Sequence, residues 1–172
     1  MKLKIVLILS CFFLLIVNAN AFKNPPFENI TVHPKPKVHA NITFKNIDNN
    51  ELSLSQFEND FFIINFWATW CAPCKKEMPS LDKLSKKKGF TVLPINLDKE
   101  NLKKINKFYN NLKIENLSIF FDEDMKLVKM FSLRGIPTTI ILNKNRQEIA
   151  RIIGEVDFLD EKFINWIKSY YK

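Results

Sequence analysis

The residues of this chain whose types and spacing are best suited to chemistry are Cys71 and Cys74, separated by Ala72 and Pro73. Two thiols at this spacing can close a disulfide across one turn of the backbone. They follow a long apolar run and open a segment with helical spacing, and at a helix N-terminus the first thiol faces unpaired backbone N–H groups and the positive end of the dipole. Such a setting lowers the pKa of a cysteine and makes it a nucleophile near neutral pH. The motif therefore predicts a thiol–disulfide exchange site.

Two kinds of metal site also use a pair of cysteines at this spacing. A zinc site needs a second Cys/Cys or Cys/His pair, but the only other cysteine is Cys11 and no histidine stands in a ligand pattern with Cys71. We therefore predict no resident metal and no cofactor other than the disulfide itself. Two thiolates can also hold Cu(I), so a copper-binding module using the same pair is an alternative, slightly supported by nearby Met78.

The N-terminal segment has the features of an export signal. Residues 1–21 combine a basic start, a short apolar run and the small-x-small ending Ala19-Asn20-Ala21. Because the apolar run is shorter than the ~20 residues that span a bilayer, we favour cleavage after Ala21 over an uncleaved inner-membrane anchor formed by residues 3–22. Either outcome predicts a periplasmic or cell-envelope location, where a disulfide can persist.

Size and charge bound the class of protein. The chain has 172 residues and a formal net charge of +8 at pH 7, which we attribute to a lysine-rich solvated surface. Once the leader is set aside, the remaining length suits one domain. Nucleic acid is a poor candidate partner for an exported chain without a binding motif.

The first half of the mature chain is expected to run from an arm into a sheet. Residues 22–39 contain four prolines and predict a linker or extended arm, with His33 and His39 as exposed loop residues. Alternation on both sides of the turn cluster 48–50 predicts a β-hairpin. The apolar run 61–67 predicts a strand buried on both faces.

The second half alternates between helices and strands. We expect a helix after Cys71, a strand over 90–97, a helix capped by Asp98, a strand over 118–121, a short helix capped by Asp122, a hairpin of strands 138–142 and 148–153, and a last amphipathic helix carrying Leu159, Phe163, Trp166, Ile167 and Tyr170. This order implies an α/β fold, a mixed sheet with helices on both faces. The cysteine turn then leaves the carboxyl end of a central strand, where α/β folds place their sites.

Two motifs carry a resemblance to a known family. Residues 67–79, WATWCAPCKKEMP, resemble the active-site segment of thioredoxin-like proteins and, more narrowly, of the exported TlpA/ResA group of bacterial thiol–disulfide oxidoreductases, with the TlpA branch nearest. Residues 134–139, RGIPTT, are similar to the cis-proline loop of that group. The resemblance implies a thioredoxin-like domain over residues 40–172, with a central mixed β-sheet flanked by helices, an N-terminal β-hairpin and a central αβ insertion.

The resemblance also assigns roles to residues. Cys71 would attack and Cys74 would resolve the mixed disulfide, while Trp70, Ala72 and Pro73 would tune the site. Ile136, Pro137 and Thr138 would form the substrate-facing loop, with the peptide bond before Pro137 in the cis form.

Glu77 is the further candidate. Thioredoxins carry a buried aspartate in the strand before the cysteines, where this chain has Asn65, and the TlpA/ResA group instead has a glutamate at the position of Glu77. The i, i+3 spacing places Glu77 on the same side of a helix as Cys74, where a partly buried carboxylate could shuttle the Cys74 proton. A surface charge favoured by the helix dipole is the alternative.

Together these features predict an exported reductant of disulfides in partner proteins, itself re-reduced by a membrane thiol electron carrier. The resemblance implies targets in copper-site assembly of cytochrome oxidase or in cytochrome c maturation. The Ala-Pro dipeptide resembles that of reducing thioredoxins, but the sequence does not fix a redox potential, and a disulfide oxidase stays an alternative.

Overall fold

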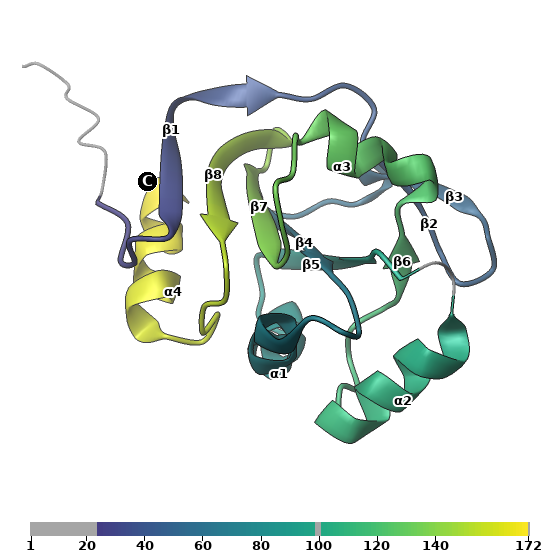
Figure 1. Cartoon of the computed structure of the whole chain (residues 1–172). Helices are drawn as coiled ribbons and strands as arrows, with labels where there is room; N and C mark the ends of the chain where they lie inside the picture. Colours follow the sequence, from purple (N-terminus) through teal and green to yellow (C-terminus); the bar gives the residue numbers. More distant parts are fainter. Residues whose placement is uncertain (1–23, 99–100, 172) are drawn as a thin grey trace, which may run out of the picture.

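The computed structural model describes residues 24–98 and 101–171 (Figure 1). A single mixed sheet of eight strands forms its centre, in the order β1-β8-β7-β4-β5-β6-β2-β3. The signal or anchor predicted for residues 1–21 lies outside the described residues. Within the described ranges, no helix has the length and apolar character needed to cross a membrane.

The elements follow one another as predicted for an α/β chain. The strands are β1 (Ile30–Val38), β2 (Thr43–Lys45), β3 (Glu51–Ser53), β4 (Phe61–Trp67), β5 (Phe90–Asn96), β6 (Phe120–Phe121), β7 (Thr138–Asn143) and β8 (Gln147–Ile153). The helices are α1 (Ala72–Ser85), α2 (Leu102–Leu112), α3 (Lys126–Met130) and α4 (Glu161–Lys168). Both predicted hairpins, β2–β3 and β7–β8, are confirmed, and α2 with β6 forms the predicted central insertion.

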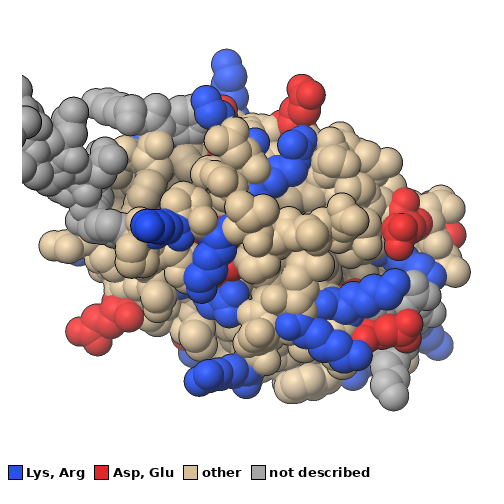
Figure 2. Space-filling model, turned by 90° about the horizontal axis from the view of Figure 1, so that it is seen from above, with Lys and Arg blue, Asp and Glu red and all other residues tan. Residues whose placement is uncertain are grey.

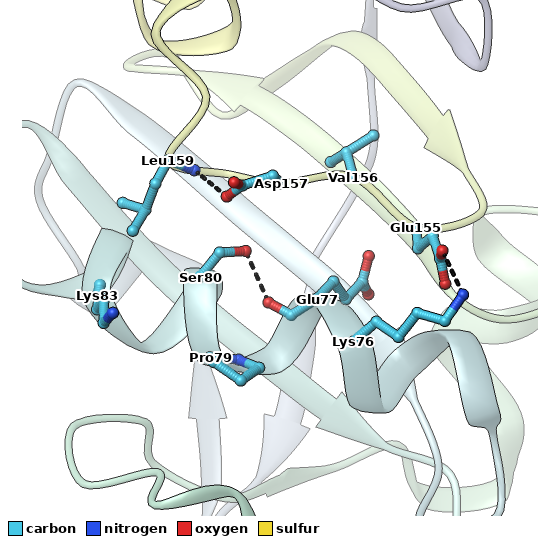
Figure 3. A pocket seen from close by; sticks show the side chains of 9 residues that line it. All are labelled: Lys76, Glu77, Pro79, Ser80, Lys83, Glu155, Val156, Asp157 and Leu159. Carbon is cyan, nitrogen blue, oxygen red and sulfur yellow. Dashed lines mark hydrogen bonds and ion pairs between the residues drawn. The ribbon is translucent and has the colours of Figure 1, made fainter.

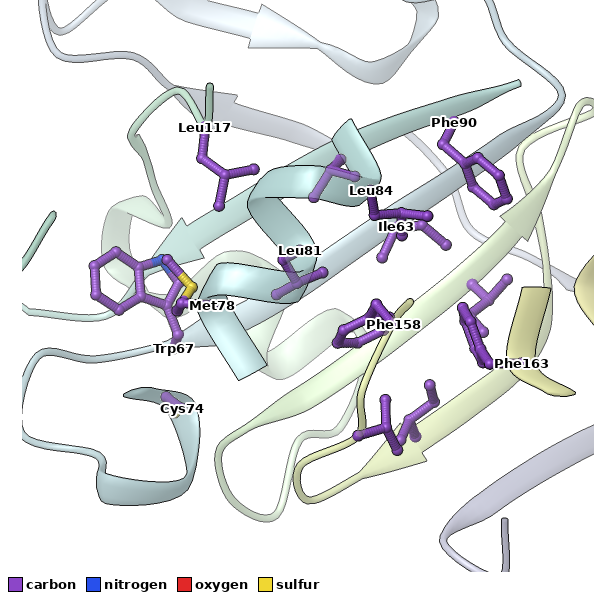
Figure 4. Packing of buried hydrophobic residues seen from close by; sticks show 14 of the residues in the cluster. Ile63, Trp67, Cys74, Met78, Leu81, Leu84, Phe90, Leu117, Phe158 and Phe163 are labelled. Atoms are coloured by element: carbon purple, nitrogen blue, oxygen red, sulfur yellow. The ribbon is translucent and has the colours of Figure 1, made fainter. Parts of the chain in front are cut away.

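Strand β4 is the centre of the molecule because every one of its residues is buried. It pairs in parallel with β5 and antiparallel with β7. Its alternate side chains enter two separate apolar clusters, with Ile63 and Trp67 in one and Phe62, Ile64 and Phe66 in the other. Figure 4 shows the first cluster, in which α1 lies across the sheet with Met78, Leu81 and Leu84 buried against Ile63 and Trp67. The sheet therefore holds the start of α1 at the carboxyl end of β4.

Basic side chains are scattered over the surface (Figure 2). Figure 2 shows Lys and Arg side chains spread over one face of the molecule with Asp and Glu side chains between them. This distribution fits the solvated, lysine-rich surface that the net charge predicted.

The predicted arm was wrong over much of its length. Residues Ile30–Val38 form the edge strand β1, which pairs antiparallel with β8 from Ile30↔Ile152 to Val38↔Gln147. The pairing is irregular between Val32 and Lys37, where the prolines of this strand stand, and an edge strand tolerates proline because one of its sides needs no N–H donor. The folded unit therefore begins before residue 40.

The two histidines of this segment are also placed differently from the prediction. The side chains of His33 and His39 are only 9% and 13% exposed, and their Nε2 atoms lie 2.8 and 2.7 Å from the two carboxyl oxygens of Glu148 on β8. They are partners of a buried carboxylate rather than free loop residues.

Asp98 does not cap α2 as predicted. Asn101 occupies the cap and accepts the backbone N–H of Lys104, whereas Asp98 Oδ2 accepts the backbone N–H of Thr69 at 2.7 Å. Asp122 does accept backbone N–H groups at the start of α3, from Leu127 and Val128, as expected.

Candidate functional site

Cys71 and Cys74 form a disulfide at the N-terminus of α1. Cys71 is the N-cap of the helix, and its Sγ accepts the backbone N–H of Cys74 at 3.3 Å. Cys71 is 4% exposed and Cys74 is fully buried, so Cys71 offers the more accessible sulfur. The first sulfur therefore lies where oriented amides favour a thiolate, as the motif predicted.

The neighbouring side chains divide between surface and core. Trp70 is 66% exposed next to the disulfide, whereas Trp67 is buried and lies with its ring centroid 4.8 Å from Phe108 and 5.7 Å from Tyr109. Ala72 is exposed and Pro73 is half-buried in the first turn of α1. Trp70 is thus the exposed tryptophan beside the disulfide.

The loop that precedes β7 lies beside the end of β4. The Ile136–Pro137 peptide bond is cis, as predicted, and the pairing of Thr138 with Phe66 brings this loop to the point where the chain leaves the sheet toward Cys71. The carbonyl oxygen of Pro137 accepts the backbone N–H of Gly154 at 2.9 Å, which fastens the loop to the end of β8. That the loop faces the substrate stays a prediction.

Glu77 is a buried carboxyl rather than the surface charge of the alternative reading. It is 1% exposed, and its Oε1 accepts a hydrogen bond from Asn65 Nδ2 at 2.7 Å. The same Asn65 nitrogen donates to Thr139 Oγ1 at 2.9 Å, so β4 and β7 together hold the amide in place. Among the described residues no donor makes a hydrogen bond to Glu77 Oε2.

Burial gives Glu77 an unusual proton affinity. Loss of solvent raises the pKa of Glu77 from 4.5 to about 8, against the opposing effects of the Asn65 amide and the Val156 backbone, while the negative charge of Glu155 raises it further. A carboxyl with this pKa is mostly neutral at pH 7, yet its pKa lies close to that of an ordinary thiol, about 8.5. Glu77 can therefore take up and release a proton near neutral pH.

Two residues that lie beside the site were not placed there by reasoning from the sequence. Asp98 is 9% exposed and holds the backbone just before the cysteine turn through Thr69; its place directly after strand β5, at the carboxyl edge of the sheet, was an available signal. Glu155 lies beside Glu77 only because the segment after β8 crosses α1, and no local motif marks it.

The described residues contain no group of three or more His, Cys, Asp or Glu side chains arranged to hold a metal ion. Met78, which gave slight support to a copper site, is fully buried in the core between α1 and the sheet. It is a packing residue rather than an accessible ligand.

Comparison with known proteins places this geometry in a family. The Redoxin family model matches residues 32–162. The thiol–disulfide oxidoreductase ResA of Halalkalibacterium halodurans is 26% identical over 134 residues, which cover 75% of this chain and 74% of that protein. StoA of Bacillus subtilis matches as a solved structure with a TM-score of 0.57 and 27% identity, over 77% of this chain and 99% of that one.

A second solved structure supports the fold. A thiol:disulfide interchange protein DsbE from Chlorobium tepidum matches with a TM-score of 0.68 and 21% identity, over 83% of this chain and all of that one. The family match spans most of the described residues, from the edge strand β1 into α4, and it includes the cysteine turn and the cis-proline loop. This chain therefore belongs to the Redoxin family, as a thiol–disulfide oxidoreductase of thioredoxin-like fold whose CxxC pair is Cys71 and Cys74.

Proposed function

We propose that the protein is exported and reduces disulfides in partner proteins through the dithiol of Cys71 and Cys74. The observation that carries the proposal is the position of the Cys71 sulfur, which caps α1 and is the more exposed of the two. The oriented amides of a helix N-terminus favour a thiolate there, and the thiolate is the attacking form in thiol–disulfide exchange.

The reaction has two exchanges. The Cys71 thiolate attacks one sulfur of the partner's disulfide, forming a mixed disulfide and releasing the partner's first sulfur as a thiolate. Cys74 then attacks the Cys71 sulfur, the Cys71–Cys74 bond forms, and the second partner sulfur leaves with its electron pair. Two electrons pass to the partner, whose thiolates take protons from solvent.

Glu77 serves the second exchange by accepting the proton of Cys74. Cys74 is fully buried, so its proton needs an acceptor inside the protein, and Glu77 follows it by three residues on α1. Because the pKa of Glu77 is about 8 in the disulfide form, the proton stays on the carboxyl at neutral pH and can return to Cys74 when the disulfide is reduced again.

The direction and the partners rest on the resemblance to the TlpA/ResA group. A reductant in an oxidising compartment must be recharged, and we propose a membrane thiol electron carrier for that step. We propose as substrates the cysteines of a copper site in cytochrome oxidase assembly or of apocytochrome c. A measured potential near about −120 mV, the value of the oxidant DsbA, with catalysis of oxidative folding, would reject the reducing direction.

Trapping of mixed disulfides tests the roles of the two cysteines. A Cys74→Ser protein should retain partners bound through Cys71, because the second exchange cannot occur, whereas a Cys71→Ser protein should retain none. Mass spectrometry of complexes from the native cell envelope reads out both. Partners trapped by Cys71→Ser but not by Cys74→Ser would reverse the assignment.

A further inference from the structure

A pocket along α1 brings the buried carboxyl of Glu77 together with charged residues that the proposed chemistry does not use. The pocket has a volume of about 500 Å³ and lies between α1 and residues 155–159, the segment that follows β8 (Figure 3). Glu77, Lys76, Lys83, Glu155 and Asp157 line it, and neither cysteine does. Small molecules in the pocket can therefore contact Glu77 without passing the disulfide.

Lys76 and Glu155 form an ion pair at this pocket. Lys76 Nζ lies 2.8 Å from Glu155 Oε1, with side chains 71% and 38% exposed. The second oxygen of Glu155 is buried and has no hydrogen-bond partner in the described structure, which is also true of Oε2 of Glu77. Figure 3 shows the two carboxyl groups directed into the space between α1 and the 155–159 segment.

We propose that Lys76 and Glu155 are positioning residues of the thiol chemistry, whose ion pair sets how readily Glu77 takes and releases the proton of Cys74. The inference rests on the proposed role of Glu77 and adds the residues that control it. Glu155 acts by its negative charge, which disfavours a second negative charge on Glu77, and Lys76 moderates that effect by pairing with Glu155.

The other groups around Glu77 are uncharged, exposed or hydrogen-bonded elsewhere. On the sheet side, the uncharged amide of Asn65 donates to Glu77 Oε1 and to the uncharged hydroxyl of Thr139. On the pocket side, Lys83 is exposed on α1, and Asp157 Oδ1 accepts the backbone N–H of Leu159. The negative charge of Glu155 raises the pKa of Glu77 further, by less than burial does.

The pocket also supplies a path for the proton. A polar space of about 500 Å³ has room for several waters, each of which occupies about 30 Å³ in the liquid. The unpaired oxygens of Glu77 and Glu155 are acceptors for such waters. The proton on Glu77 can therefore reach solvent while a partner covers Cys71.

The test is the titration of the Glu77 carboxyl in the disulfide form, followed by NMR of protein labelled with ¹³C in the glutamate carboxyls and assigned by comparison with Glu77→Gln. We expect Glu155→Gln to lower the midpoint by about 0.5–1 pH unit and Lys76→Met to raise it by a similar amount. The pH at which the rate of the second exchange changes should move in the same directions.

Matched controls separate the pair from a general charge effect. Asp157→Asn removes another carboxylate of the same pocket, and Lys75→Met removes an exposed lysine that does not line it. Each should move the midpoint by less than about 0.3 pH unit, because Asp157 is engaged with the Leu159 backbone and Lys75 lies outside the pocket. Shifts in Glu155→Gln and Lys76→Met that are no larger than in the controls, or that share one sign, would overturn the inference.

A different result would show that the proposed role of Glu77 itself is wrong. If Glu77→Gln leaves the rate of the second exchange unchanged at every pH, Glu77 has no part in the proton transfer and the pair has nothing to control. If Glu77→Gln slows that exchange but Glu155→Gln and Lys76→Met behave like their controls, the role of Glu77 stands and only the pair is excluded.

Discussion

Glu77 and Glu148 are both buried glutamates, 1% and 0% exposed, but their surroundings drive their proton affinities in opposite directions. Glu77 receives one side-chain hydrogen bond, from Asn65, and burial raises its pKa to about 8. Burial also raises the pKa of Glu148, but the hydrogen bonds from Arg151, His33 and His39 outweigh it and hold the pKa below the ordinary value of 4.5.

The contrast shows that loss of solvent alone does not decide the pKa of a buried carboxyl, because hydrogen-bond donors and a nearby cation can outweigh it. Arg151 reaches both oxygens of Glu148, at 3.0 and 3.3 Å, and each oxygen also meets a histidine. Glu148 stays charged and ties β1 to β8. Glu77, with one oxygen unpaired, changes protonation near neutral pH and is suited to chemistry.

The largest expected effect is a loss of stability when Glu148, the carboxyl with several hydrogen-bond donors, is replaced. Glu148→Gln should lower the free energy of unfolding at pH 7 by about 3–5 kcal/mol, because it leaves Arg151 and the histidines without their buried charge. Urea denaturation measures it. The same chemical change at the other site, Glu77→Gln, should not destabilise at pH 7, and equal losses from the two variants would remove the distinction between them.

The next effect is the pH dependence of stability that Glu77 imposes. Its pKa in the folded protein lies above 4.5, so its contribution favours the folded state below pH 4.5 and is lost as the pH rises through 8. Glu77→Gln should therefore gain about 2–4 kcal/mol relative to the unsubstituted protein between pH 5 and pH 9. Urea titrations at both pH values check this, and a constant difference between the two proteins would contradict it.

A smaller effect is expected from the histidines that contact Glu148. His33→Gln or His39→Gln should each cost about 1–2 kcal/mol and increase hydrogen exchange along β1, since each removes one donor or acceptor of the buried cluster. The larger loss is expected for His39, whose ring also lies 4.6 Å from that of Phe131. Lys35→Gln, on an exposed position of the same strand, is the control, and an equal loss there would mean that the histidines do not fasten β1.

Local patterns were enough to predict the elements around Glu77 and the cysteine pair. The cysteine spacing, the continuous apolar run of β4 and the helical spacing after Cys74 are signals within about fifteen residues, and the structure confirms each element. The i, i+3 relation put Glu77 on the side of Cys74. The degree of its burial was not predictable, because it depends on the segment 155–159 packing across α1 from the far end of the chain.

The surroundings of Glu148 were not predictable from local patterns. His33 and His39 contact Glu148 across 115 and 109 residues, and no periodicity encodes such a pairing. Strand β1 is mostly exposed and carries prolines, so its composition resembles that of an arm. Asp98 was wrongly predicted to cap a helix for a related reason. An aspartate before a helical segment can equally accept a hydrogen bond from a distant part of the chain, here the backbone N–H of Thr69.

The most direct test of the account is one titration of the disulfide form in which the carboxyls of both buried glutamates are followed together by ¹³C NMR. The account predicts that Glu77 titrates near pH 8 and Glu148 below pH 4.5, on opposite sides of the ordinary value of a glutamate. A Glu77 carboxyl that titrates at that ordinary value of 4.5 would contradict it.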